Sequence, residues 1–123
     1  MNASNFLQYK NWVVVGDVLN HLKYAYKILH SLKESGYNAV GLNPSVENGE
    51  AYSNLSSIPF QVEVLNLCIT PTKGIKILQE ALELKIDKIL IQPGAESPEI
   101  LNFCKVNGIQ AIEGCTLVEL STR

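Results

Sequence analysis

Apolar and polar positions alternate along this chain with two different periods. Strand signals, which are short segments rich in apolar residues, fall at residues 12–15, 39–42, 62–69, 88–91 and 109–112. Between the first two runs, apolar residues recur at helical spacing, namely Ala25, Ile28, Leu29 and Leu32, and Gly36 follows as a helix stop. Strands that alternate with helices in this way predict a parallel sheet covered by helices.

Two further helices are predicted from their start signals. Thr70-Pro71 and Ser97-Pro98 each place a hydroxyl residue before a proline, whose missing N–H does no harm at the first helical position. We therefore expect both hydroxyl residues to cap a helix. Residues 43–59, in contrast, are polar and rich in turn formers, so this crossover is predicted to be mostly loop.

These elements predict a single Rossmann-like domain over residues 1–123, with a doubly wound five-stranded parallel sheet of order 3-2-1-4-5. Ligands bind such sheets at the carboxyl ends of the strands, where the strand order reverses, and here that point lies between strands 1 and 4. The first strand ends in Gly16, and the fourth runs into Gln92-Pro93-Gly94-Ala95. The sequence therefore predicts one composite site between two glycine turns.

Each candidate residue in these turns has a plainer alternative. Gly16 would let a phosphate approach the backbone, but the G-x-G-x-x-G spacing is missing, so a simple tight turn is favoured and NAD is not supported. Lys23 is either a phosphate-binding cation or a solvated surface lysine. Asp17 would repel a phosphate unless its side chain points away. Asn43-Pro44 ends the second strand, where turn punctuation is the favoured interpretation.

Composition narrows the class of partner. The chain has 123 residues, a net charge of −2 and scattered basic residues, which argues against nucleic acid as a partner. No apolar run approaches the roughly 20 residues that a membrane-spanning helix needs. The first residues lack the features of a secretory signal, so a cytoplasmic location is expected. Three widely spaced cysteines without a C-x-x-C pair predict neither a disulfide framework nor a zinc site. The sequence is compatible with a homodimer.

The inventory of groups for catalysis is poor. His21 and His30 lie on or beside the first helix and are predicted to be solvated. Cys68 and Cys104 lie within apolar patterns and are predicted to be core residues. Cys115 follows the last strand and would lie near the carboxyl edge of the sheet, where an idle thiol is favoured over a reactive one. No pair of nucleophile and base is evident, and the chain is more simply a non-enzyme.

With these residues in place, the chain resembles a family of small stand-alone CoA-binding domains, which are similar to the CoA-binding domain of succinyl-CoA synthetase alpha subunits. The resemblance spans residues 11–120. It rests on V-V-G at 14–16, N-P at 43–44, Q-P-G-A-E-S at 92–97 and a late cysteine, Cys115. The Q-P-G-A-E-S match is the most specific part.

The resemblance implies a CoA or acyl-CoA ligand in the crevice. The residues that it implies for this site are Gly16, Asp17, Val18, Lys23, Tyr24, Asn43, Pro44, Ile69, Thr70, Pro71, Gln92, Pro93, Gly94 and Ala95. Two positions depart from the family pattern: Val18 stands where a serine or threonine is usual, and Asp17 adds a negative charge.

Three functions remain open at this point. The first is a non-enzymatic domain that binds CoA, an acyl-CoA or a related nucleotide. The second is a thiol-dependent acyl-transfer enzyme that uses Cys115. The third is a degenerate domain that has lost CoA binding and acts through protein partners or self-association, an alternative that Asp17 and Val18 favour.

Overall fold

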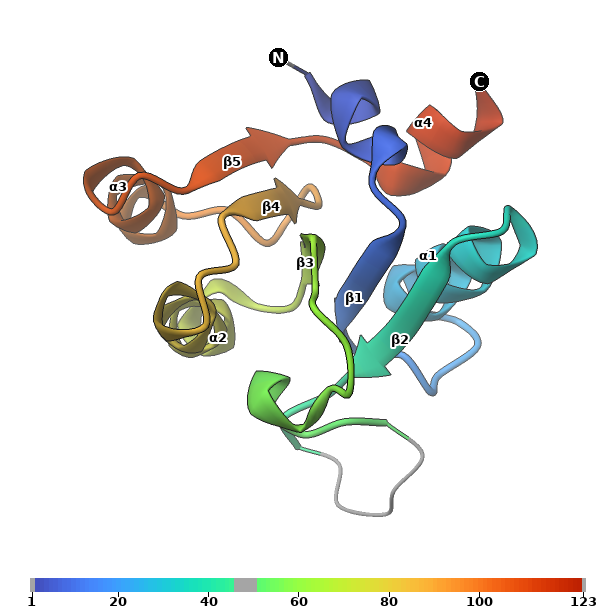
Figure 1. Ribbon diagram of the computed structural model, residues 1–123, viewed down its shortest axis with the longest axis horizontal. Coiled ribbons are helices and arrows are strands. Elements are labelled where there is room, and N and C mark those ends of the chain that lie inside the picture. The colour runs from blue at the N-terminus through green and yellow to red at the C-terminus, as the bar shows by residue number, and fades with distance from the viewer. Residues whose placement is uncertain (1, 46–50, 123) are drawn as a thin grey trace.

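The computed structural model describes residues 2–45 and 51–122 as a three-layered α/β fold, in which helices cover both faces of a parallel sheet (Figure 1). The strands are β1 (Asn11–Gly16), β2 (Asn38–Leu42), β3 (Val64–Cys68), β4 (Lys88–Ile91) and β5 (Gln110–Glu113). The helices are α1 (Tyr24–Glu34), α2 (Pro71–Glu83), α3 (Pro98–Val106) and α4 (Thr116–Ser121), with short 3-10 helices η1 (Ala3–Gln8) and η2 (Leu55–Ser57). The predicted Rossmann-like class with five parallel strands is confirmed.

The predicted strand order is wrong. The described sheet has the order β2-β1-β3-β4-β5 instead of 3-2-1-4-5, so β3 pairs with β1 and does not lie outside β2. In its register Val13 pairs with Leu65 and Gly16 pairs with Cys68. The point at which the strand order reverses therefore lies between β1 and β3, and β4 is one strand farther away.

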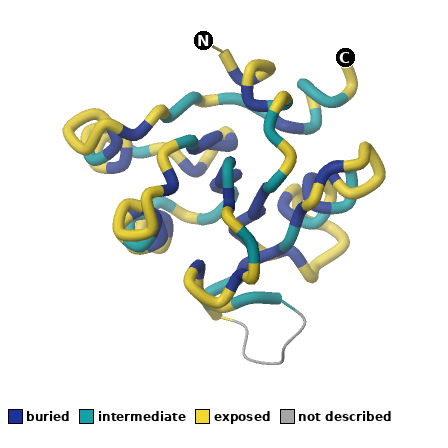
Figure 2. The backbone as a smooth tube through the Cα atoms, viewed as in Figure 1, coloured by how far each residue is buried: buried dark blue, intermediate teal, exposed yellow. Residues whose placement is uncertain are grey.

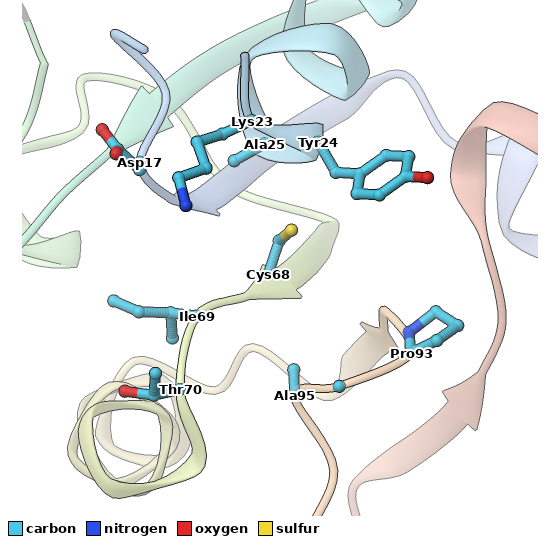
Figure 3. Close-up of a pocket in the computed structure, with 10 residues that line it drawn as sticks. Asp17, Lys23, Tyr24, Ala25, Cys68, Ile69, Thr70, Pro93 and Ala95 are labelled. Carbon is cyan, nitrogen blue, oxygen red and sulfur yellow. The ribbon is translucent and has the colours of Figure 1, made fainter.

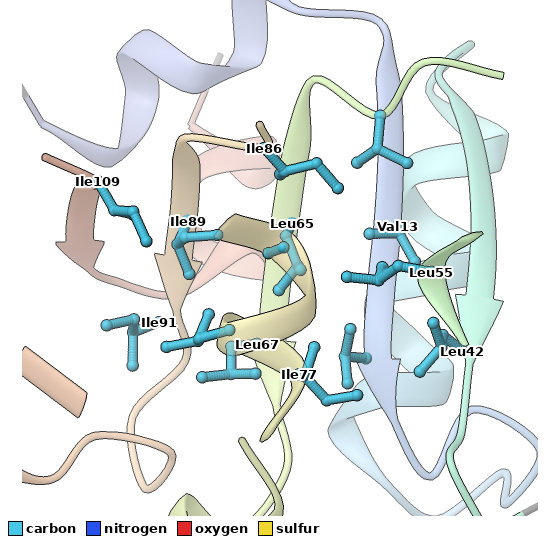
Figure 4. Packing of buried hydrophobic residues seen from close by; sticks show 14 of the residues in the cluster. Val13, Leu42, Leu55, Leu65, Leu67, Ile77, Ile86, Ile89, Ile91 and Ile109 are labelled. Carbon is cyan, nitrogen blue, oxygen red and sulfur yellow. The ribbon is translucent and has the colours of Figure 1, made fainter. Parts of the chain in front are cut away.

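The crossover from β2 to β3 explains this order. Leu55 of η2 packs in one apolar cluster with Val13 and Leu65, whereas α1 packs in another cluster on the opposite face of the sheet (Figure 4). The chain thus leaves β2, passes β1 on the face that α1 does not cover, and enters β3 on the other side of β1. Part of this crossover, residues 46–50, lies outside the described residues.

Alternating side chains of the strands supply both clusters. Along β1, Val13 and Val15 face α2 and η2, while Trp12 and Val14 face α1, and all four side chains are fully buried. Figure 2 shows the central strands β1, β3 and β4 as mostly buried, while the edge strand β5 is only partly buried and exposed residues gather on the outer sides of the helices and in the turns. Burial on both faces is what a parallel sheet with helices on each side requires.

The capping residues predicted for the helix starts are confirmed only in part. Ser97 caps α3 as predicted, because its hydroxyl accepts a hydrogen bond from the Ile100 N–H at 3.1 Å. Thr70 precedes α2 and Pro71 occupies its first turn, but the Thr70 side chain makes no capping hydrogen bond, so that expectation is wrong. The apolar stripe predicted for α1 is confirmed by four buried side chains: Ala25, Ile28, Leu29 and Leu32.

The two terminal helices were not predicted. η1 and α4 pack together on the α1 side of the sheet (Figure 1), where Phe6 is fully buried. Thr116 of α4 donates a short, buried hydrogen bond from its hydroxyl to Oδ1 of Asn66 in β3. Among the described residues, no helix combines the length and apolar character needed to cross a bilayer.

Candidate functional site

A pocket of about 360 Å³ opens at the carboxyl edge of the sheet, beside the reversal of strand order (Figure 3). Turns after β1, β3 and β4 and the start of α1 form its walls. The lining residues are Asp17, Lys23, Tyr24, Ala25, Cys68, Ile69, Thr70, Pro93, Gly94 and Ala95. Its volume falls within the usual range for small-molecule sites, and most of the lining is apolar.

Gly16 ends β1 because no larger residue fits there. A Cβ on Gly16 would lie 2.2 Å from the carbonyl oxygen of Cys68 and 2.9 Å from Cβ of Ala25. The close contact is with the backbone of the paired strand, which cannot move aside without breaking the ladder. Gly16 is therefore explained by the packing of β1 against β3, in line with the simple turn that the sequence favoured, and it does not line the pocket.

Val18 lies below the pocket and not in it. Its side chain is only 1% exposed and belongs to the cluster that contains Ala25 and Leu29. It covers Gly41 of β2 so closely that a Cβ there would lie 2.7 Å from Cγ2 of Val18. A hydroxyl side chain in this orientation would point into the core. The absence of a serine or threonine at this position therefore removes no phosphate donor from the pocket in this arrangement.

Lys23 and Asp17 are the two charged residues among those that line the pocket. Figure 3 shows the ammonium group of Lys23 reaching from the start of α1 toward the space above Ile69, while the carboxylate of Asp17 points away from Cys68 and Thr70. No ion pair joins Lys23 to Asp17, both of which lie in the described part of the chain. The orientation of Asp17 is the one that a phosphate site would require.

The turn after β4 is closed by its own hydrogen bonds. The Gly94 N–H donates to the Glu96 carboxylate at 2.8 Å, and the Ala95 N–H donates to the Gln92 carbonyl at 2.9 Å. These two N–H groups are therefore engaged within the turn. Pro93, Gly94 and Ala95 form an apolar wall instead.

Gln92 turns inward from the same segment. It is 5% exposed, and its Nε2 donates to Sγ of Cys115 at 3.1 Å, while its Oε1 has no partner among the described residues. The predicted place of Cys115 near the carboxyl edge is thus confirmed, since it immediately precedes α4 beside Gln92. Neither residue is among those that line the pocket.

Three more of the expected site residues lie outside the pocket lining. Asn43 is used within its own turn, because its Oδ1 accepts a hydrogen bond from the Ser45 N–H at 2.9 Å. Its backbone N–H donates to the Tyr52 carbonyl at 2.8 Å. Pro44 follows in the same turn, and Pro71 lies in the first turn of α2. The hydrogen bonds of Asn43 fit the turn interpretation.

Cys68 corrects the expectation of a core residue. It is partly buried at the end of β3, and its side chain lines the pocket between Lys23 and Ala95 (Figure 3). Burial, with a smaller effect from the nearby Cys115, raises the pKa of the Cys68 thiol to about 11. The thiol is therefore protonated at neutral pH and is a poor nucleophile. Cys104 is a core residue as predicted, and burial raises its pKa to about 11 as well.

The pocket thus combines the Lys23 ammonium group, which forms no ion pair within residues 2–45 and 51–122, with a lining that is otherwise mostly apolar. Ala25 and Cys68 are the lining residues that sequence reasoning missed, although the position of Cys68 directly before the Ile69-Thr70 turn was a usable signal. Within residues 2–45 and 51–122, no group of three or more His, Cys, Asp or Glu side chains could hold a metal ion. The arrangement suits a ligand that has an anionic end and an extended, largely neutral body.

Solved structures share this fold. A conserved hypothetical protein from Pyrococcus furiosus is 31% identical, with a TM-score of 0.81 over 90% of this chain and 99% of that one. A hypothetical protein from Pyrococcus horikoshii OT3 is 22% identical, with a TM-score of 0.84 over 94% of this chain and 84% of that one. A structure from Thermus thermophilus is 22% identical, with a TM-score of 0.82 and coverage of 95% and 92%.

No curated protein matches the chain. A family model described as a CoA binding domain, however, matches residues 10–121, which include every strand and every residue that lines the pocket. This range agrees with the resemblance seen in the sequence. The chain therefore belongs to the CoA-binding domain family.

Proposed function

We propose that this domain binds CoA or an acyl-CoA in the pocket at the carboxyl edge of its sheet, without carrying out chemistry on it. The observation that supports this most is the position of Lys23, the single cation among the lining residues, at the start of an 11-residue helix that faces an apolar pocket. The N-terminus of a helix carries unpaired N–H groups and a partial positive charge, which favour a phosphate.

The two ends of such a ligand would meet different surroundings. Lys23 and the start of α1 would bind the phosphates, since an ammonium group donates short hydrogen bonds to phosphate oxygens. Ile69, Pro93 and Ala95 would contact the neutral pantetheine arm. The thiol of Cys68 would form part of the wall along this arm as an uncharged group.

The state of the thiol in the pocket lining supports binding without catalysis. Cys68, the thiol in the lining, is protonated at neutral pH, so it would not attack a thioester. Acyl transfer through Cys115 is the alternative, because Gln92 links that thiol to the turn that contains Pro93. Covalent labelling by a thioester analogue, lost in Cys115→Ser and kept in Cys68→Ser, would establish acyl transfer in place of simple binding.

Isothermal titration with CoA, acetyl-CoA, ADP and NAD tests the proposal. We expect saturable binding of CoA and acetyl-CoA, and about a tenfold to a hundredfold loss of affinity in Lys23→Ala, because a charge-assisted hydrogen bond to phosphate is removed. Lys33→Ala, in the last turn of the same helix, is the control and should bind like the parent protein. Absence of heat for all four ligands would overturn the proposal and favour a domain that acts through protein partners.

A further inference from the structure

An aromatic stack joins the segment before α1 to α1 itself, outside the lining of the pocket. The ring of His21 lies parallel to that of Tyr26, with centroids 4.4 Å apart and planes inclined by 20°. The ring of His30 lies 4.1 Å from Tyr26 at 36°. The Tyr26 ring is thus in contact with two histidine rings, one from the loop and one from the helix.

The loop histidine is rigidly connected to Lys23. Asn20 closes a short turn, since its Oδ1 accepts a hydrogen bond from the Leu22 N–H at 3.0 Å and its carbonyl accepts one from the Lys23 N–H at 3.0 Å. His21 lies inside this turn. A contact that fixes the His21 ring therefore also fixes the backbone from which the Lys23 side chain departs.

Few other contacts hold this turn against the rest of the molecule. The residues from Leu19 to Tyr24 are all exposed, and Leu22 is 85% exposed. Val18 anchors the start of the loop in the core, and Ala25 anchors the helix, but the side chains between them are not buried. The stack of His21 on Tyr26 joins the loop part of this stretch to α1, while Lys27 contacts its end, through a hydrogen bond from the Lys27 N–H to the Lys23 carbonyl at 3.3 Å and an ammonium group 5.5 Å from the Tyr24 ring centroid.

We propose that His21 and Tyr26 are positioning residues, which hold the Lys23 ammonium over the pocket and so tune its affinity for the phosphate end of a ligand. This inference rests on the proposed function. Without the stack, the turn that contains Leu22 would be free to move away from α1. Lys23 would then become ordered only when the ligand binds, and the entropy cost of this ordering would lower the affinity. An aromatic pair of this kind corresponds to about a three- to tenfold change in an equilibrium constant.

His30 provides a matched control within the same stack. It contacts the same tyrosine ring, four residues along the helix, but it lies within α1 and has no place in the turn. Replacing either histidine removes one ring from Tyr26. Only the loss of His21 is expected to release Lys23, so the two variants separate a positioning role from a general effect on the helix.

The experiment is titration of CoA into His21→Ala, His30→Ala and Tyr26→Phe, with each variant's folding checked by thermal unfolding. We expect about three- to tenfold weaker binding for His21→Ala, binding within about twofold of the parent for His30→Ala, and retained binding for Tyr26→Phe, which keeps the ring. Equal losses in the two histidine variants, or no loss in His21→Ala, would overturn the proposal.

A double variant tests whether His21 acts through Lys23. In a Lys23→Ala background, the further change His21→Ala should leave the remaining CoA affinity unchanged, because a positioning residue has nothing left to position. An additive loss would instead assign His21 a direct contact with the ligand. A parent protein that binds no CoA would refute the proposed function itself, an outcome that differs from a parent that binds CoA but ignores the change at His21.

Discussion

The turns that contain Gly16 and Gly94 lie on either side of the pocket and look alike in the sequence, but a different physical constraint requires glycine in each. At Gly16 the limit is space, because a Cβ would lie 2.2 Å from a backbone oxygen of the neighbouring strand. At Gly94 nothing lies within 4 Å of such a Cβ, and the limit is the backbone angle φ of +98°. The turn at Gly16 leads to the charged side chain of Lys23. The turn at Gly94 uses its N–H groups in hydrogen bonds to Gln92 and Glu96, and it presents an apolar surface to the pocket.

This contrast teaches that a strand end with glycine is not by itself an anion site. The charged side chains of the pocket lining, Asp17 and Lys23, lie on the α1 side of the pocket, and the lining residues on the β4 side, Pro93, Gly94 and Ala95, are uncharged. The following variants test that division.

The largest effect is expected for Gly16→Ala. The added methyl group would press on the carbonyl of Cys68, so β1 and β3 would have to separate. Overpacking should lower the free energy of unfolding by about 3 kcal/mol, as measured by urea denaturation. A loss below about 1 kcal/mol would contradict the steric explanation of this turn.

The next effect concerns Cys68, which lies between the two turns. With a pKa of about 11, compared with the ordinary 9.0, its thiol should hold about 100-fold less thiolate at pH 8. In a Cys104→Ala, Cys115→Ala background, burial, the larger cause of the shift, still raises the pKa of Cys68, so the rate of alkylation by iodoacetamide should keep rising with pH beyond the ordinary 9.0. A plateau near pH 9 would show that the pocket wall does not desolvate this thiol.

A smaller effect is expected for Gly94→Ala. The position has room for a methyl group, so only the left-handed backbone is penalised, at about 1–2 kcal/mol in unfolding free energy. Gly36→Ala is the control, because Gly36 also has open space and a φ of +92° but lies at the far end of α1. The two variants should be equally destabilised in denaturation, and only Gly94→Ala should alter CoA affinity. A much greater loss for Gly94→Ala would show that this turn is sterically constrained too.

The smallest effect is expected for Asp17→Asn. The carboxylate is exposed and points away from the pocket, so solvent screens its repulsion of a bound phosphate. Titration at low salt should give about a twofold gain in CoA affinity. A gain of tenfold or more would mean that the carboxylate faces the ligand when it is bound.

The helices α1, α2 and α3 and the class of the fold were predictable because their signals are local, whereas η1 and α4 were not predicted. Ala25, Ile28 and Leu32 repeat at the spacing of one helix face, and Ser97-Pro98 is a start signal within two residues. The strand order was not predictable in this way. Whether Leu55 of the crossover packs on one face of β1 or the other is decided by tertiary contacts, and the apolar pattern is the same in both cases.

The site was predictable at the level of turns but not of side chains. Parallel strands end at a common edge, so the turns that contain Lys23, Thr70 and Pro93 had to approach one another once β1, β3 and β4 were placed in one sheet. Which residues of these turns line the pocket depends on the orientation of each side chain. Asp17 and Val18 are adjacent in sequence, yet one lies at the rim of the pocket and the other in the core.

The packing of Val18 on Gly41 has an evolutionary consequence. The Val18 side chain fills the space that a side chain at position 41 would need, since the Cβ of an alanine there would lie 2.7 Å from Cγ2 of Val18 and 3.0 Å from Cδ2 of Leu29. A larger residue in β2 is therefore tolerated only together with a smaller one at position 18. Among related chains, the residues at positions 18 and 41 should therefore covary. A substitution in β2, which does not line the pocket, would then be accompanied by a substitution in the loop after β1, which does.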